Sequence, residues 1–172
     1  MKCVIHGSGG VGGYYGGCLA RAGHEVFFIA RGAHLEAIQQ QGLSIKSAQG
    51  DFRIETPKSE ERCDPNFDPD LVIVAVKSWQ LPEITEEIKN YCTPSTLILP
   101  LQNGADASDI LADTLGPERV LGGLTKIFSK IEAPGVIKHF TGATYIGFGE
   151  YFQDPQFQNA PDSLSERCRN LE

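Results

Sequence analysis

The stretch GSGGVGGYYGG, residues 7–17, contains seven glycines among its eleven residues. Glycine loses more conformational freedom on folding than any other residue, so such a cluster needs a structural reason. Gly7, Gly9 and Gly12 have the spacing Gly-x-Gly-x-x-Gly, and the apolar segment KCVIH (residues 2–6) precedes them. A strand, this fingerprint and a helix, in that order, predict the phosphate-binding turn of a dinucleotide-binding domain. The alternative is a glycine-rich turn that binds nothing.

The spacing assigns a separate task to each glycine. Gly7 permits the sharp turn out of the strand, Gly9 lets a pyrophosphate approach the backbone, and Gly12 lets the helix pack closely on the strand. N–H groups at the start of the helix are then available to phosphate oxygens. Gly16 and Gly17 lie inside the expected helix, where a glycine costs about 1 kcal/mol relative to alanine. We therefore expect these two residues to pack closely against the sheet or a neighbouring element.

Strand and helix patterns alternate along the chain. The run DLVIVAV (residues 70–76) is continuously apolar, which is typical of a strand buried on both faces of a parallel sheet. The expected strands are 2–6, 25–30, 70–76, 96–101 and 120–124, and the expected helices are 11–22, 33–41, 82–92 and 107–115. This alternation predicts an α/β fold with a Rossmann-type, doubly wound and mostly parallel sheet, in one domain over residues 1–172.

Two further pairs of segments predict antiparallel hairpins. LSIKS (residues 43–47) and FRIET (residues 52–56) flank the turn-forming residues AQGD. Val136–His139 and Tyr145–Phe148 are expected to form a second hairpin that turns at Thr141-Gly142-Ala143.

The composition excludes several classes of protein. A formal net charge of −7 argues against nucleic acid as a partner. No run is long and apolar enough to cross a membrane and no signal-peptide pattern opens the chain, so we expect a cytoplasmic protein. The five cysteines form no C-x-x-C pair and are expected to be reduced, and the four histidines show no metal-ligand spacing. We expect the acidic segment Lys58–Asp70 to be a solvated loop.

The residue after the second strand bears on the choice of cofactor. In NAD-binding domains an acidic residue about twenty positions after the fingerprint binds the ribose 2′-hydroxyl. Here the second strand ends in Ile29-Ala30-Arg31, without an acid. A guanidinium at this place can hold a 2′-phosphate through paired hydrogen bonds. Arg31 therefore favours NADP over NAD; the alternative is a solvated surface arginine.

Two polar side chains follow the next two expected strands. Lys77 ends DLVIVAVK, and Asn103 follows TLILPLQ. Ligands of open parallel sheets bind beyond the carboxyl ends of the strands, so we expect both side chains at the ligand crevice. Lys77 would bring a positive charge there, and Asn103 can donate and accept hydrogen bonds. The alternatives are a charge at the end of a buried strand and a turn residue in Asn-Gly.

These features together resemble the ketopantoate reductases (2-dehydropantoate 2-reductases). The resemblance covers residues 1 to about 150. It rests on GSGGVGGYYGG, Arg31, VKSWQ around Lys77, LQNG around Asn103 and VLGGLTKIFSKIEAPGVIKHFTGATYIGFGE. This family reduces 2-dehydropantoate to (R)-pantoate with NADPH, a step on the route to pantothenate and coenzyme A.

The resemblance implies a set of binding residues in this chain. The pyrophosphate of NADP would be bound by Gly7, Ser8, Gly9, Gly10, Val11 and Gly12. Arg31 would hold the 2′-phosphate, and Lys77 and Asn103 would contact both the cofactor and a 2-oxo acid substrate. Phe128, in the loop Thr125–Phe128, would lie near the nicotinamide. Reduction places negative charge on the carbonyl oxygen, which must be stabilised and protonated.

The sequence also departs from the family. Its members carry a second, largely helical domain that supplies the proton-donating lysine, whereas this chain stops at Glu172. We therefore expect a domain incomplete before its last strand, without a catalytic residue of its own, since Lys77 suits charge stabilisation better than proton donation. The segment DSLSERCRNLE (residues 162–172) is expected to be a helix capped by Ser163. Apolar surface left uncovered predicts self-association.

Three functions stay open at this point. The chain is the NADPH-binding part of a ketopantoate reductase, a stand-alone NADP-binding sensor or regulatory module, or a fragment of another NADP-dependent hydroxyacid reductase.

Overall fold

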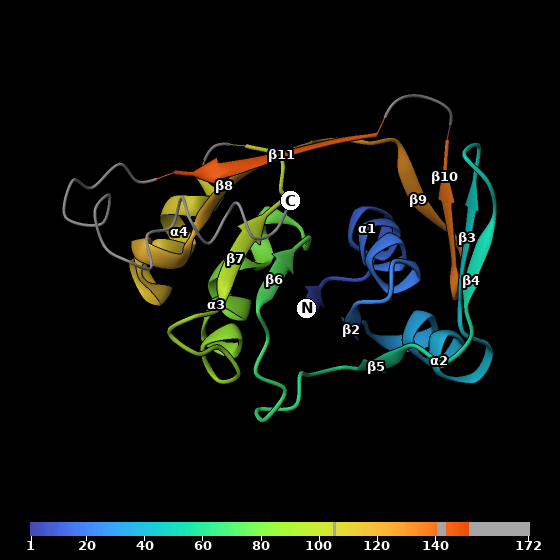
Figure 1. Cartoon of the computed structure of the whole chain (residues 1–172), viewed down its shortest axis with the longest axis horizontal. Coiled ribbons are helices and arrows are strands. Elements are labelled where there is room, and N and C mark those ends of the chain that lie inside the picture. Colours follow the sequence, from blue (N-terminus) through green and yellow to red (C-terminus); the bar gives the residue numbers. More distant parts are fainter. Residues whose placement is uncertain (105, 141–143, 152–172) are drawn as a thin grey trace.

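A computed structural model shows a five-stranded parallel sheet at the centre of the molecule and describes residues 1–104, 106–140 and 144–151 (Figure 1). The strands of this central sheet are β1 (Lys2–His6), β2 (Glu25–Ile29), β5 (Lys58–Glu60), β6 (Leu71–Val74) and β7 (Leu97–Pro100). Their order in space is β5-β2-β1-β6-β7. The chain thus winds outward from β1 in both directions, which confirms the doubly wound α/β prediction.

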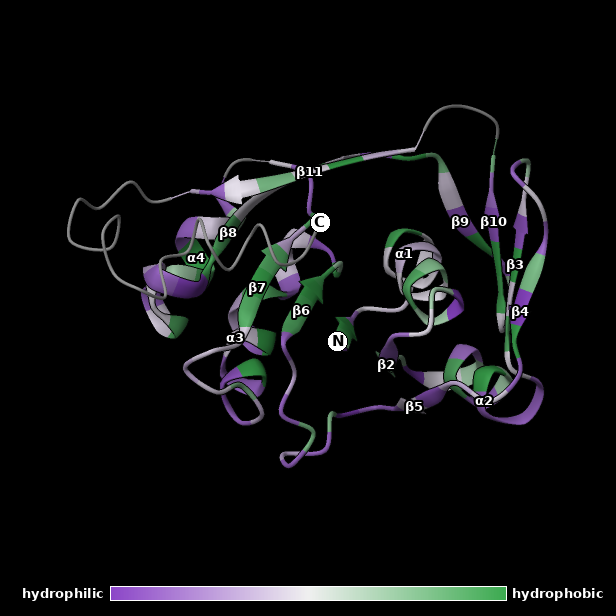
Figure 2. Cartoon of the chain, in the orientation of Figure 1, coloured by the Kyte–Doolittle hydropathy of each residue, from purple (hydrophilic) through white to green (hydrophobic). Residues whose placement is uncertain are grey.

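Helices cover both faces of the central sheet. They are α1 (Gly10–Arg21), α2 (Gly32–Gln41), α3 (Leu81–Lys89) and α4 (Ala107–Leu115), with short 3-10 turns η1 (Ser78–Gln80) and η2 (Pro117–Arg119). Ile5 and Ile73 point into the core on the side of α1, whereas Val4 and Val72 point into the core that contains residues of α3 and α4. Because both faces are buried, β6 is hydrophobic along its whole length and β7 is hydrophobic from Leu97 to Leu99 (Figure 2).

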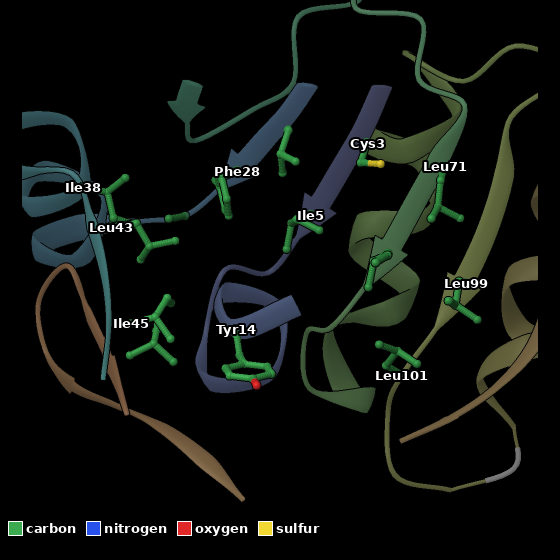
Figure 3. Packing of buried hydrophobic residues seen from close by; sticks show 14 of the residues in the cluster. Cys3, Ile5, Tyr14, Phe28, Ile38, Leu43, Ile45, Leu71, Leu99 and Leu101 are labelled. Carbon is green, nitrogen blue, oxygen red and sulfur yellow. The ribbon is translucent and has the colours of Figure 1, made fainter. Parts of the chain in front are cut away.

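A second sheet packs on the outer side of α1. Its strands are β3 (Leu43–Ser47), β4 (Phe52–Ile54), β9 (Ser129–Ala133) and β10 (Val136–His139), in the order β4-β3-β10-β9. The helix α1 therefore lies between two sheets (Figure 1). The close-up in Figure 3 shows Ile5 and Phe28 of the central sheet on one side of α1 and Ile45 of the second sheet on the other. The hairpin predicted for 43–47 and 52–56 is confirmed, and it forms half of this second sheet.

The glycines of α1 explain how one helix fits between two sheets. A Cβ on Gly16 would lie 2.6 Å from side-chain atoms of Ile5 and Phe28 in the central sheet. On the opposite face, a Cβ on Gly13 would lie 2.8 Å from Ile137, and one on Gly17 would lie 3.1 Å from Ile45. Both faces of the helix are therefore too close to their neighbours for a larger residue. This confirms the expected close packing of Gly16 and Gly17.

The second predicted hairpin is wrong. Val136–His139 (β10) pairs with β9 and β3, while Tyr145–Glu150 (β11) pairs with Leu121–Lys126 (β8) as a separate two-stranded sheet. The turn before β10 is the Pro134-Gly135 pair, and Gly135 has a φ of +72°. Proline followed by glycine is typical of a type II turn, so the sequence contains the signal for a β9–β10 hairpin. The expected turn residues 141–143 lie outside the described residues.

The segment Lys58–Asp70, predicted to be a solvated loop, contains a strand and several buried residues. Lys58–Glu60 forms the edge strand β5, parallel to β2, and Ser59 is buried there. Cys63 and Phe67 are buried in the core that also contains residues of α3 and α4, and the ring of Phe67 packs edge-on against Phe27 of β2. The sequence pattern does not predict this strand, because only one of its three side chains faces the interior and the other two are charged and exposed.

Other predicted elements differ only at their ends. The strand predicted at 70–76 ends at Val74, and the helix predicted at 82–92 begins one residue earlier, at Leu81, and ends at Lys89. The strand predicted at 120–124 meets the central sheet at one bridge, between Val120 and Ile98, before the chain continues into β8. The helix expected at 162–172 and its cap at Ser163 lie outside the described residues.

Two findings concern expectations drawn from the composition. Among the described residues, no helix is long and apolar enough to cross a membrane. The four cysteines in the described part of the chain, Cys3, Cys18, Cys63 and Cys92, are free thiols, and Cys168 lies outside it.

Replacement of Gly16 by alanine tests the packing of α1. The added methyl group would lie 2.6 Å from both Ile5 and Phe28, so the cost falls in the upper part of the range for overpacking a core, about 2–3 kcal/mol. The helix propensity of alanine offsets about 1 kcal/mol of this loss. We expect denaturant unfolding to show a net destabilisation of about 1–2 kcal/mol in Gly16→Ala. Gly149→Ala, where no atom lies within 4 Å of the added methyl group, is the control. An unchanged or raised stability of Gly16→Ala would contradict this account.

Candidate functional site

A cavity of about 260 Å³ lies beyond the carboxyl ends of β1, β2 and β6. The strand order reverses between β1 and β6, which is where open α/β sheets bind their ligands. Much of its lining comes from the segments that follow three strands and from one helix: Gly7, Ser8 and Gly9 after β1, Ala30 and Arg31 after β2, Ala75, Val76 and Lys77 after β6, and His34 of α2. The predicted phosphate-binding turn and Arg31 therefore share one cavity.

The turn between β1 and α1 has a geometry that requires glycine at its start. Gly7 has a φ of +101°, and a Cβ there would lie 2.8 Å from Val76. The backbone N–H of Ser8 donates to the carbonyl oxygen of Ile29 at 2.9 Å, which ties the turn to the end of β2. Gly7 thus turns the chain from β1 towards α1, at a point where the residues after β6 leave no room for a side chain.

The next residues of the turn fit an anionic ligand. No atom lies within 4 Å of the place where a Cβ of Gly9 would be, in contrast to the crowding at Gly7 and Gly12. The first hydrogen bond within the helix runs from Gly13 N–H to Gly9 O at 2.7 Å, so the N–H groups before it have no partner within the helix. The hydroxyl of Ser8 is buried and has no hydrogen-bond partner among the residues that the structure describes. Open space, free N–H groups and an unpartnered hydroxyl fit the phosphate oxygens of a dinucleotide.

Arg31 is the residue immediately before α2, and its side chain remains half exposed. Its guanidinium nitrogen lies 3.8 Å from a carboxylate oxygen of Glu83, whose side chain is 72% exposed. Exposed ion pairs of this kind contribute at most about 1 kcal/mol. The guanidinium is therefore free to exchange this partner for a phosphate group, which binds arginine through two hydrogen bonds.

His6 lines the same cavity, but it belongs to the core of the protein. The ring is 1% exposed, and its Nδ1 lies 2.9 Å from the hydroxyl of Tyr91. Burial, with a smaller contribution from the positive charge of Arg31, lowers the pKa of His6 to about 4. Burial also raises the pKa of Tyr91 well above its usual value, so the phenol keeps its proton and can donate it to a neutral His6 ring.

Lys77 and Asn103 line a neighbouring cavity of about 250 Å³. This second cavity shares Ala75, Val76 and Lys77 with the first one. The backbone of Lys77 is held on both sides by Gln80: Lys77 N–H donates to the side-chain oxygen of Gln80 at 3.1 Å, and Gln80 N–H donates to Lys77 O at 2.9 Å. The ends of β6 and β7 thus bring the two predicted residues together at one cavity, beside the glycine turn.

Phe128 lines neither of these two cavities. Its side chain is 65% exposed, in the connection between β8 and β9, and its carbonyl oxygen accepts a hydrogen bond from Phe140 N–H at 2.8 Å. The next residue, Ser129, lies beside the start of α1, where a Cβ on Gly10 would be 2.7 Å from Ser129 O. The placement of Phe128 near the nicotinamide stays a prediction.

Three site residues were not predicted from the sequence. His34 lies on the first turn of α2 and touches the glycine turn, and Gln80 lines the first cavity. Gln102 lies between Leu101 and Asn103, and both polar atoms of its side chain are buried without a partner. Gln80 and Gln102 could have been predicted as site residues, because they lie in the same KSWQ and LQNG segments as Lys77 and Asn103. Nothing in the local sequence indicates a role for His34.

Comparisons with known proteins agree with this geometry. Residues 3–151 match the family described as "Ketopantoate reductase PanE/ApbA". A 2-dehydropantoate 2-reductase of Pyrococcus abyssi is 34% identical over 148 residues, which are 86% of this chain and 47% of that protein. The crystal structure of a 2-dehydropantoate 2-reductase from Geobacter metallireducens is 33% identical with a TM-score of 0.82, and the match covers 92% of this chain and 52% of that one.

A further solved structure carries a bound cofactor. It is a ternary structure of D-mandelate dehydrogenase with NADH and anilino(oxo)acetate, which is 25% identical with a TM-score of 0.81. The match covers 98% of this chain and 55% of that one. In all of these comparisons the chain spans about half the length of the protein that it matches.

The buried His6 predicts a pH dependence of stability. The folded pKa of about 4 lies below the ordinary value of 6.5, so the unfolded chain takes up the proton first. The free energy of unfolding is therefore unaffected by His6 above about pH 6.5. It decreases as the pH falls towards 4, by on the order of 3 kcal/mol in total. Denaturant unfolding at pH 7, 5.5 and 4.5 measures this loss. In His6→Gln the slope between pH 6.5 and 4 should be shallower, and in the control His24→Gln it should remain. Equal slopes in all three proteins would rule out His6 as the source.

Proposed function

We propose that this chain, which belongs to the ketopantoate reductase family, binds NADPH as the nucleotide-binding part of a 2-dehydropantoate 2-reductase. The observation that carries the proposal is the glycine turn, where open space at Gly9 and the unpartnered hydroxyl of Ser8 meet Arg31 in one cavity. Relatives named 2-dehydropantoate 2-reductase support the same activity for the whole protein. Because this chain spans about half of their length, the complete reaction belongs to the proposal as well.

The turn residues would hold the pyrophosphate. Gly7, Ser8, Gly9, Gly10, Val11 and Gly12 form the turn and the first residues of α1. The N–H groups at the start of α1 and the positive end of its dipole would meet the phosphate oxygens. The hydroxyl of Ser8 would find there the hydrogen-bond partner that it lacks among protein atoms.

Arg31 supports NADPH over NADH as the cofactor. The solved structure of D-mandelate dehydrogenase contains NADH, so close structural similarity does not decide between the two. In this chain Arg31 follows β2 closely; its guanidinium is half exposed, and within the described part of the chain its one ion pair is with the exposed Glu83. A cation at this position is suited to the 2′-phosphate of NADPH, whereas an acid would bind the free 2′-hydroxyl of NADH.

Lys77 and Asn103 would serve both the cofactor and the substrate. A nicotinamide cofactor supplies hydride to the carbonyl carbon of a 2-oxo acid. Lys77 provides a cation at the junction of the two cavities, where it would stabilise negative charge on an anionic substrate. The amide of Asn103 would orient the carbonyl group by donating a hydrogen bond to it. Phe128 would complete the nicotinamide end of the site.

We also propose that the chain associates with itself through apolar surface near β8 and β11. Leu124 and Tyr145, on the paired strands β8 and β11, are 59% and 55% exposed, which is unusual for large apolar side chains so close together. Light scattering over a range of concentrations should show dimers or larger species, and Leu124→Lys should shift the distribution towards monomers. A monomer at high concentration for the unchanged chain would contradict this proposal.

Titration with NADPH and NADH, followed by cofactor fluorescence, tests the proposed function. We expect saturable binding with a preference for NADPH. Arg31→Ala should weaken NADPH binding by about tenfold or more and leave NADH binding nearly unchanged, because it removes hydrogen bonds to a charged group. Lys89→Ala, which removes one positive charge from the last turn of α3, is the matched control. Equal affinity for the two cofactors in the unchanged chain would contradict the role of Arg31, and the absence of binding would contradict the function.

A further inference from the structure

One imidazole ring joins three separate segments of the chain. His34 lies on the first turn of α2, and its ring is partly buried. Its Nε2 atom lies 2.9 Å from the carbonyl oxygen of Ser8 in the glycine turn. Its Nδ1 atom lies 3.0 Å from the backbone nitrogen of Gly135, in the turn between β9 and β10. The ring therefore bridges the phosphate-binding turn and the second sheet.

The two contacts determine which nitrogen carries the hydrogen. The backbone N–H of Gly135 can only donate, so Nδ1 must accept and must be unprotonated. The hydrogen then sits on Nε2, which donates to the oxygen of Ser8. A neutral ring with its hydrogen on Nε2 satisfies both neighbours, and burial lowers the pKa of His34, which favours this neutral form.

The contact with Ser8 determines how the glycine turn presents its backbone. Ser8 N–H donates to Ile29 O, and Ser8 C=O accepts from His34, so the peptide groups on both sides of Ser8 are held. In a trans peptide the N–H and the C=O point in opposite directions. Holding the Ser8 carbonyl towards His34 therefore turns the N–H of Gly9 away from it. Gly9 is the residue of the turn that has open space beside its backbone.

The contact with Gly135 gives the ring a fixed support. Gly135 has a φ of +72°, and its carbonyl oxygen accepts a hydrogen bond from Ser44 N–H of β3 at 2.9 Å. A Cβ on Gly135 would lie 3.2 Å from Ala37 of α2, so the turn also packs against the helix that carries His34. The second sheet, which lines little of the cavity itself, thus reaches the phosphate-binding turn through His34.

We propose that His34 is a positioning residue that holds the Ser8–Gly9 peptide so that Gly9 N–H faces the pyrophosphate of the bound cofactor. This inference rests on the proposed function, because it assigns His34 a task in binding a dinucleotide. His34 acts through the backbone of the turn and touches no phosphate itself. It should therefore matter for ligands that contain the pyrophosphate and not for ligands that bind only around Arg31.

Two ligands separate these cases: NADPH and adenosine 2′-monophosphate, which has the 2′-phosphate and lacks the pyrophosphate. Three variants of the full chain are compared with the unchanged chain. His34→Leu removes both hydrogen bonds, His34→Gln keeps a donor and an acceptor on its amide, and His24→Leu replaces a histidine at the opposite end of β2.

We expect His34→Leu to bind NADPH about five- to tenfold more weakly, because the hydrogen bond between Gly9 N–H and the pyrophosphate is lost. It should bind adenosine 2′-monophosphate within twofold of the unchanged chain. His34→Gln should recover NADPH binding to within about twofold, and His24→Leu should not change it. Equal weakening of both ligands would overturn the proposal in favour of a direct contact of His34 with the adenosine end. A lower melting temperature with unchanged NADPH affinity would overturn it in favour of a purely structural role.

A measurement on the unchanged chain covers the case in which His34→Leu fails to fold. Nitrogen-15 NMR of the histidine rings at pH 7 should show His34 as a neutral ring with its hydrogen on Nε2. A hydrogen on Nδ1 would overturn the proposal, because the ring could then not accept from Gly135 and donate to Ser8. If the unchanged chain binds adenosine 2′-monophosphate but the variants do not differ for NADPH, only the role of His34 fails. If it binds neither ligand, the proposed function fails first.

Discussion

The close approach of α1 to two sheets is the constraint on which the rest of this structure depends. The helix touches the central sheet through Gly16 and the second sheet through Gly13 and Gly17, and at each of these positions a Cβ would lie about 3 Å or less from a neighbouring side chain. Glycine inside a helix lowers the intrinsic stability of the helix, so packing on both sides has to provide the free energy that keeps α1 helical. The two sheets do so by enclosing the helix between apolar side chains.

The same constraint shapes the candidate binding site. Because α1 lies tightly against β1, the chain must reverse sharply at Gly7, and α1 begins beside the cavity at the end of the sheet between β1 and β6. Gly9 differs from its neighbours, since its missing side chain leaves space rather than relieving a clash. Packing thus explains most of the glycines in the cluster, and the proposed binding of a dinucleotide would explain Gly9, where packing makes no demand.

The charges of the site oppose the charge of the whole chain. The protein carries a formal net charge of −7, yet Arg31, Lys77 and the start of α1 direct positive charge towards the two connected cavities. The nearest buried titratable side chain, His6, is kept neutral by its low pKa of about 4. An anionic ligand would therefore meet a local positive field on the surface of an acidic protein, and no buried charge would have to be compensated.

The sequence by itself determined the central unit, because its signals are local. The glycine spacing after KCVIH, the apolar run before Lys77 and Arg31 after the second strand follow from residues that are neighbours in the chain, and β1, α1, β2 and β6 are where these signals place them. Only the tertiary structure decided which strands pair at long range. Val136–His139 and Tyr145–Phe148 are equally suited to each other and to other partners, and packing on α1 draws the first of them to β3. The link from Ser8 through His34 to Gly135 likewise spans most of the chain, and no local pattern predicts it, because a hydrogen bond between distant segments depends on a geometry that only the folded chain provides.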